Sequence, residues 1–144
     1  MIKGYLTGSP GRRRPFVHAV VEFPALAKQL DVELLIDTRA DHTVLAPRDA
    51  QRLGVDLTAL GPGQPSIGVG GQMQTHTIVA VVLLETFITE PFSLTILDPL
   101  PGAVLPIPSL LGRDLLSHFA LFLEERTSRA LLLEPSEVDE LHLP

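Results

Sequence analysis

The sequence contains no cysteine and very little clustered basic charge. The absence of cysteine excludes disulfide bonds and thiol chemistry, although it leaves the redox state of the compartment open. A net charge of −6 and a pI near 5.2 argue against nucleic acid as the main partner, because phosphate binding requires a basic face. The one basic run, Arg12-Arg13-Arg14, is interpreted as a solvated segment rather than as a nucleic-acid arm.

Long apolar runs are also missing. The first six residues lack the apolar core of a signal peptide, and the most apolar stretch, residues 78–84, is too short to span a bilayer. These absences predict a cytoplasmic location without a membrane partner.

Several motifs of enzyme sites are absent as well. The sequence has no Gly-x-Ser-x-Gly pattern of a serine hydrolase and no glycine-rich phosphate loop that ends in lysine. No two histidines stand at the i, i+4 spacing of zinc proteases, and we expect no metal and no cofactor. The histidines are interpreted as surface or partly buried residues, and only His42 lies near a motif that we discuss below.

The fold class follows from the many prolines and glycines, 13 and 11 respectively, which separate short apolar runs. This texture is typical of an all-β chain, and 144 residues suffice for a single domain, residues 1–144, with its own core. The predicted strands are residues 16–23, 32–36, 78–84, 92–97, 121–123 and 130–133. The predicted short helices are residues 47–53 and 113–119, and residues 135–144 are expected to be loosely held.

Within this pattern, an apolar strand ends in a turn that begins with the carboxylate of Asp37, and the segment reads Leu34-Leu35-Ile36-Asp37-Thr38-Arg39-Ala40-Asp41. A strand-like Thr43-Val44-Leu45 follows, and a second apolar pair later runs into Leu110-Leu111-Gly112-Arg113-Asp114. The order of these segments resembles the retropepsins, the retroviral-type aspartic proteases. The resemblance implies a closed β-barrel-like acid-protease fold that is homodimeric.

The resemblance also implies roles for single residues. Asp37 matches the catalytic carboxylate, Thr38 the residue that bonds the partner's turn across the two-fold axis, and Ala40 a small residue that lines the cleft. Asp41 matches the acidic residue that pairs with Arg113. The chemistry requires two carboxylates, and this chain has one such turn, which is why a dimer is implied. The alternatives are that Asp37 caps a turn and that Arg113 is a solvated helix residue.

A glycine-rich segment lies midway between these motifs. It resembles the tip of the flap, the hairpin that closes over substrate in the family, and glycine suits such a hairpin because it allows close approach to a peptide. The alternative is an ordinary loop. The residues of the segment are Ile67, Gly68, Val69, Gly70 and Gly71.

Arg39 departs from the family pattern, which has glycine at this position. We expect its side chain to obstruct the cleft and to lower the pKa of the nearby carboxylates, unless it points outward. Two functions remain open: an aspartic endopeptidase that hydrolyses peptide bonds in peptides or unfolded proteins, and an inactive dimer that binds a peptide or a protein partner.

Overall fold

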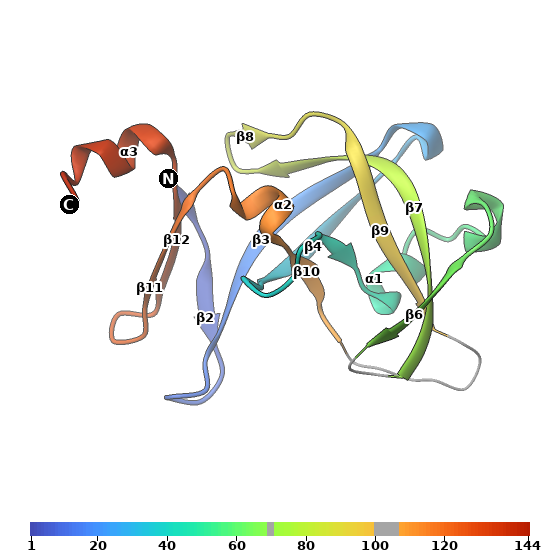
Figure 1. Cartoon of the computed structure of the whole chain (residues 1–144), viewed down its shortest axis with the longest axis horizontal. Coiled ribbons are helices and arrows are strands. Elements are labelled where there is room, and N and C mark those ends of the chain that lie inside the picture. The colour runs from blue at the N-terminus through green and yellow to red at the C-terminus, as the bar shows by residue number, and fades with distance from the viewer. Residues whose placement is uncertain (69–70, 100–106) are drawn as a thin grey trace.

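The protein is built from β-strands with three short α-helices, and its computed structural model describes residues 1–68, 71–99 and 107–144 (Figure 1). The strands are β1 (Ile2–Lys3), β2 (Tyr5–Thr7), β3 (Arg14–Phe23), β4 (Lys28–Ile36), β5 (Val44–Leu45), β6 (Gln64–Gly68), β7 (Gly71–Leu84), β8 (Phe87–Ile88), β9 (Phe92–Pro99), β10 (Ser109–Leu111), β11 (Ala120–Glu124) and β12 (Arg129–Leu133). The α-helices are α1 (Pro47–Gln51), α2 (Arg113–Leu116) and α3 (Pro135–Glu140).

Six strands close into a barrel. The pairing runs β3-β4-β10-β5-β9-β7, and β7 returns to β3 through the register Val21↔Val82. Closure leaves no free edge within this ring, and inward side chains fill it. The largest fully buried side chains include Phe23, Leu34, Leu45, Leu84, Leu94, Ile96 and Leu111. The prediction of an all-β, closed β-barrel-like fold is therefore confirmed.

The β3–β4 hairpin extends the strand that we predicted at residues 32–36. β4 begins at Lys28, because Pro24 starts a one-turn 3₁₀ helix and Ala27 adopts a left-handed conformation that closes the turn. The side chains of β4 alternate between exposed and buried up to Ile36. The polar residues at the beginning of β4 occupy the exposed positions of this alternation. The strand therefore begins before residue 32, and the connection between β3 and β4 is shorter than the predicted strands left for it.

β7 contains the predicted strand at residues 78–84. Although this run is continuously apolar, Val79 is 49% exposed while Ile78 and Ala80 are buried. One face of this strand therefore packs into the barrel and the other meets solvent.

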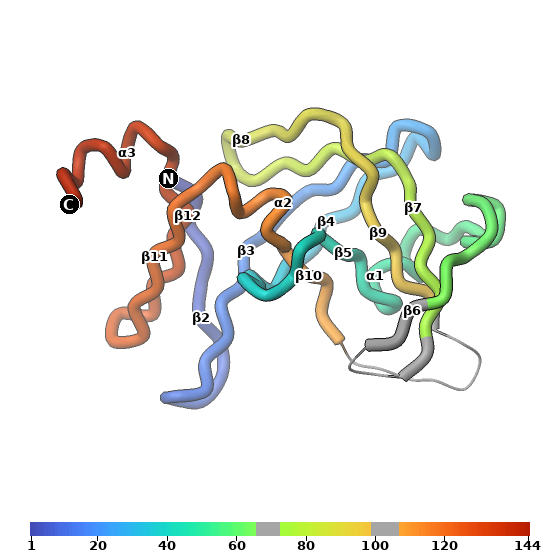
Figure 2. Tube along the Cα trace, viewed as in Figure 1, coloured from blue at the N-terminus to red at the C-terminus, as the bar shows by residue number. Residues whose placement is uncertain are grey.

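A second sheet of three strands, in the order β1-β12-β11, lies at one end of the molecule (Figure 1). The sequence analysis did not predict β1 or β2, which are too short to show a pattern. The last residues are more ordered than expected: Pro135 begins α3, and the side chain of Glu137 bonds the backbone of Glu134 in a capping box. The amino group of Met1 lies 2.8 Å from Glu137, so the N-terminus contacts α3 beside β12 (Figure 2).

The two predicted helices are confirmed in shorter form. Pro47 opens α1, and Gly54 follows its last turn with a φ of 65°. α2 carries the buried Leu115 and Leu116. No helix among the described residues is long and apolar enough to cross a membrane.

The side chain of Tyr5, which reaches from β2 across β3 to Glu33 of β4, gives a pH-dependent test of this contact. Its hydroxyl donates to Oε2 of Glu33 at 2.8 Å, and partial burial together with this bond raises the pKa of Tyr5 to about 12 from 10.0. A proton held more tightly in the folded state stabilises the fold below pH 10, and this contribution is lost between about pH 10 and 12.

We expect the phenolate absorbance to titrate near pH 12 while circular dichroism shows a folded chain. The signal belongs to Tyr5 alone, because the sequence has one tyrosine and no tryptophan. Glu33→Gln should lower the midpoint, and the exposed control Glu90→Gln should leave it unchanged. A midpoint at 10 in the folded protein would contradict the contact.

Candidate active site

The carboxylate of Asp37 is placed by the parallel pairing of β4 with β10. Leu34, Leu35 and Ile36 pair in register with the three residues of β10, and the Asp37 N–H then donates to the Leu111 carbonyl at 3.1 Å. β10 also pairs with β5, which begins just after the turn. Both ends of the turn are therefore attached to the same short central strand, and Asp37 is half-buried where β4 ends.

The turn itself is closed by hydrogen bonds within the chain. One carboxylate oxygen of Asp37, Oδ1, accepts the Arg39 N–H at 2.9 Å, and the Asp37 carbonyl accepts the Ala40 N–H at 3.2 Å. The turn-capping role considered for Asp37 is thus real, but it uses one oxygen. The second oxygen, Oδ2, accepts no hydrogen bond from the described part of the chain. Thr38 is exposed beside it.

The start of α2 packs against the far side of the turn. The Arg113 and Asp114 N–H groups donate to the carbonyls of Ala40 and Asp41 at 2.8 and 3.2 Å. The Arg113 guanidinium also lies 3.2 Å from the Asp41 carboxylate, as the sequence predicted. Both side chains are largely exposed, so this ion pair contributes at most about 1 kcal/mol. The backbone bonds hold the turn more firmly than the ion pair does.

A buried network that the sequence analysis missed joins the same segments. The Asp114 carboxylate accepts the Thr43 N–H at 3.0 and 2.9 Å and the Thr43 hydroxyl at 2.7 Å. The Thr43 Oγ1 in turn accepts the Gly112 N–H at 3.1 Å. Thr43 is buried, so its polar atoms need these partners. The signal in the sequence is the acidic residue that directly follows Gly112-Arg113.

A second buried network attaches α1 to β10. The Ser109 hydroxyl donates to the Asp49 carboxylate at 2.6 Å and accepts the Ala46 N–H at 2.9 Å. Asp49 is buried and also lies 3.2 Å from the partly exposed Arg52. The strand that supports the turn is therefore fixed on both sides by hydrogen-bonded carboxylates.

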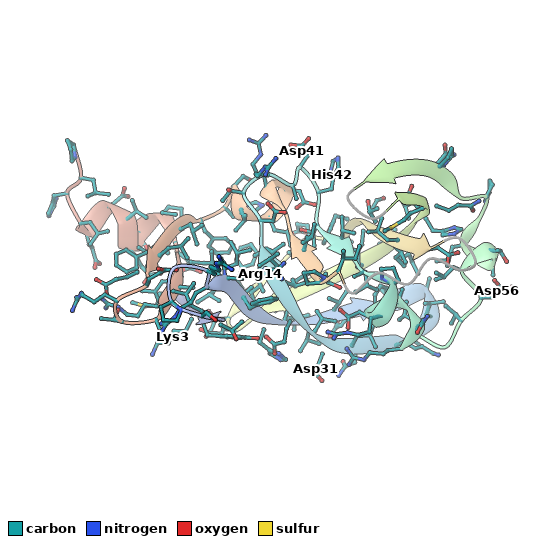
Figure 3. The ribbon with its side chains drawn as sticks, turned by 90° about the horizontal axis from the view of Figure 1, so that it is seen from below. Lys3, Arg14, Asp31, Asp41, His42 and Asp56 are labelled. Atoms are coloured by element: carbon teal, nitrogen blue, oxygen red, sulfur yellow. The ribbon has the colours of Figure 1, made fainter. Side chains whose placement is uncertain are left out.

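Gly112 is required by space rather than by its backbone angles. Its φ of −93° is open to any residue, but an added Cβ would lie 2.4 Å from the carbonyl carbon and oxygen of His42. The backbones of the two segments therefore touch at this point, where α2 meets the turn. His42 and Asp41 project outward from the same edge of the molecule (Figure 3).

Arg39 is exposed, and it makes no ion pair with Asp37 within 4.0 Å. Its backbone is not strained either, since the non-glycine residues with positive φ among the described residues are Ala27, Glu85, Ser128 and His142. Arginine therefore fits the turn of the single chain without backbone strain.

A groove of about 640 Å³ runs from the turn to the second sheet. Polar groups of the turn and of α2 line one part of it, and apolar side chains line the rest. The lining residues are Thr38, Asp41, Arg113, Asp114, Leu116, Ser117, Phe119 and Leu121.

The glycine-rich segment lies in the β6–β7 hairpin, where Ile67 pairs with Gln72 and Gly68 with Gly71. Val69 and Gly70, which we assigned to the same flap, lie outside the described residues. Across the described ranges, no group of three or more histidine or acidic side chains is arranged to hold a metal ion.

Comparison with known protein families gives one match, and it covers the site. The family model described as "Aspartyl protease" matches residues 23–115, which is more than half of the chain and includes the turn, the hairpin and Gly112. The chain belongs to this aspartyl protease family. A comparison with curated proteins found no significant match.

Solved structures of aspartic proteases show the same fold. A retropepsin-like aspartic protease from Rickettsia conorii is similar with a TM-score of 0.61 and 18% identity, covering 92% of this chain and 100% of that one. The protease of EIAV, solved with the inhibitor HBY-793, has a TM-score of 0.50 and 22% identity, covering 77% and 92%. The resemblance to the retropepsins, drawn from the motifs, is confirmed at the level of family and fold.

The close approach at Gly112 generates a stability test. Gly112→Ala should lower the free energy of unfolding by roughly 2–3 kcal/mol, because the new methyl group overlaps the His42 backbone and must push the turn away from α2. Chemical denaturation measures the loss. Gly63→Ala is the matched control, since its Cβ would meet only the flexible side chain of Gln74. Equal stability of the two variants would show that the segments do not touch.

Proposed function

We propose that the chain is one half of a dimeric aspartic endopeptidase of the retropepsin type. The observation that carries the proposal is the Asp37 carboxylate, half-buried at the end of β4, with its turn fixed by Leu111 and by the start of α2. One oxygen is used inside the turn, and the other is available to a second carboxylate and to water. The family match and the fold support this assignment.

The mechanism needs two Asp37 side chains that share one proton. Two carboxylates in contact cannot both ionise easily, so one stays protonated and the other acts as a base. The base takes a proton from the attacking water, and the acid donates one to the oxygen of the scissile carbonyl. Thr38, exposed beside Asp37, is in place to bond the partner's turn across the axis. The β6–β7 hairpin would close over the substrate as a flap.

The dimer interface that we propose includes the groove and β11. Thr38 and Leu121 both line the groove. β11 forms the end of the three-stranded sheet, and its outer edge has no partner strand among the described residues. Phe122 and Leu123 on this strand are exposed. An exposed edge strand with apolar side chains favours pairing with another strand, and the same edge of a second copy offers one.

The second candidate function is a dimer that binds peptides without cutting them. Arg39 favours it, because it lies two residues from Asp37 in the same turn and a dimer would bring two copies of it toward the axis. Glycine at this position in the family leaves room for the substrate backbone. The unstrained backbone of Arg39 means that replacing it by glycine changes the cleft and not the turn.

Substitutions at Asp37 and Arg39, two residues apart in the turn, test both candidate functions. Arg39→Gly should raise cleavage of unfolded protein substrates at mildly acidic pH by about tenfold or more, because it opens the cleft. Adding Asp37→Asn should remove the activity, since general acid–base catalysis typically contributes about 10²–10⁴-fold. Peptidase assays with and without pepstatin measure both effects.

Asp31→Asn is the control for Asp37→Asn, because it makes the same chemical change at an exposed position of β4. Cleavage by the native protein that depends on Asp37, with little gain in Arg39→Gly, would reject the binding-only candidate. An inactive Arg39→Gly variant whose two Asp37 side chains lie far apart in the assembled protein would reject the endopeptidase.

The interface is tested at Leu123. A glutamate there should convert the dimer, with twice the 15.6 kDa mass of one chain, into a monomer at micromolar concentration, because it adds a buried charge to the β11 edge. Sedimentation equilibrium measures the mass. Val79→Glu is the matched control, since both side chains are 49% exposed on strands. A native protein that sediments as a monomer would count against the dyad itself.

A further inference from the structure

A small pocket with two arginines lies near the candidate active site. Its volume is about 230 Å³, which is less than the roughly 300–1,000 Å³ of pockets that enclose whole small molecules. The size suits one side chain of a longer ligand. The lining combines charged and apolar groups: Arg14, Phe16, Glu33, Arg48, Ile107 and Pro108.

The lining of this pocket carries two arginines and one acidic residue, so one positive charge is in excess. Arg14 and Arg48 are exposed and form no ion pair with any described residue. The Arg14 guanidinium lies over the Phe16 ring at 5.8 Å, which holds it along the pocket wall. Glu33 is the one acidic lining residue, and both of its oxygens are engaged, Oε2 by Tyr5 and Oε1 by His18 at 3.0 Å.

The pocket lies on the same face of β4 as Asp37. Side chains of a strand alternate, so Glu33 and Leu35 point to one side while Leu34 and Ile36 point into the core, and Asp37 directly follows the strand at the next position of the first set. Four residues of strand separate Glu33 from Asp37 by about 13 Å. An extended peptide bound at Asp37 along this face therefore reaches the pocket within about four of its own residues.

We propose that this pocket makes the chain selective for peptides that carry an aspartate or glutamate within about four residues of the bond held at Asp37. Two unpaired guanidinium groups favour a carboxylate, and the apolar ring and prolyl surface beside them exclude part of the water that would screen it. The selectivity contrasts with the net charge of −6 on the whole chain, which otherwise repels acidic peptides. The inference rests on the proposed peptide site at Asp37.

Peptide selection on a protein that cannot cut tests the inference. The full chain with Asp37→Asn is immobilised and offered a randomised pool of acetylated, amidated decapeptides at low salt, and the retained peptides are identified by mass spectrometry. We expect aspartate and glutamate to be enriched about fivefold over the input, the range of an exposed ion pair, and the enrichment to fall at high salt.

The variants separate charge from structure. Arg14→Gln and Arg48→Gln should each reduce the enrichment and together abolish it, whereas Arg48→Lys should retain most of it because it keeps the charge. Arg12→Gln is the matched control: it removes one exposed arginine of the same run that does not line the pocket. Circular dichroism checks that each variant is folded.

Three results overturn the inference, and they differ in what else they reject. Retained peptides without acidic enrichment, or enrichment that survives the double variant, reject the selectivity alone. Failure to retain any peptide rejects the peptide site at Asp37 as well. If the native protein cleaves no peptide while the Asp37→Asn chain still retains acidic peptides selectively, the endopeptidase is rejected and the selectivity of the pocket is supported.

Discussion

The contact between Gly112 and the backbone of His42 is the constraint on which the candidate site depends. It allows α2 to begin directly behind the turn, where the N–H groups of Arg113 and Asp114 bond the turn carbonyls. β10 reaches this point only because its parallel pairing with β4 brings the two strand ends level. The position of Asp37 is thus set by main-chain geometry that begins 72 residues away in the sequence, at Ser109, with surface ion pairs adding little.

The fold and the turn could be predicted because their signals are local. Short apolar runs between prolines and glycines indicated strands, and the Asp-Thr turn with the later Leu-Leu-Gly-Arg segment indicated the family. The missed features are non-local or very short. β1 has two residues, and the network from Asp114 to Thr43 joins positions 71 residues apart. No single-sequence pattern states that such side chains meet, although an acidic residue beside Gly112 is compatible with it.

Arg39 shows where a motif and a structure give different information. As a departure from the family pattern, it suggested a blocked cleft and altered carboxylate chemistry. In the folded chain its backbone is unstrained and its side chain is exposed and apart from Asp37. Glycine at Gly112 is needed for space within one chain, whereas position 39 accommodates arginine without backbone strain.

The arginines near the turn differ in whether an acidic group of the same chain balances their charge. Arg113 forms an ion pair with Asp41, so an acidic group of the same chain already balances its charge. Arg14, Arg39 and Arg48 have no acidic partner among the described residues, although the chain has an excess of acidic groups that could have supplied one. Unpaired cations on an acidic protein attract anionic ligands over a distance comparable to the Debye length, about 8–10 Å in physiological salt. The acidic peptide that we propose as ligand would supply the partner that the chain itself does not give to Arg14 and Arg48.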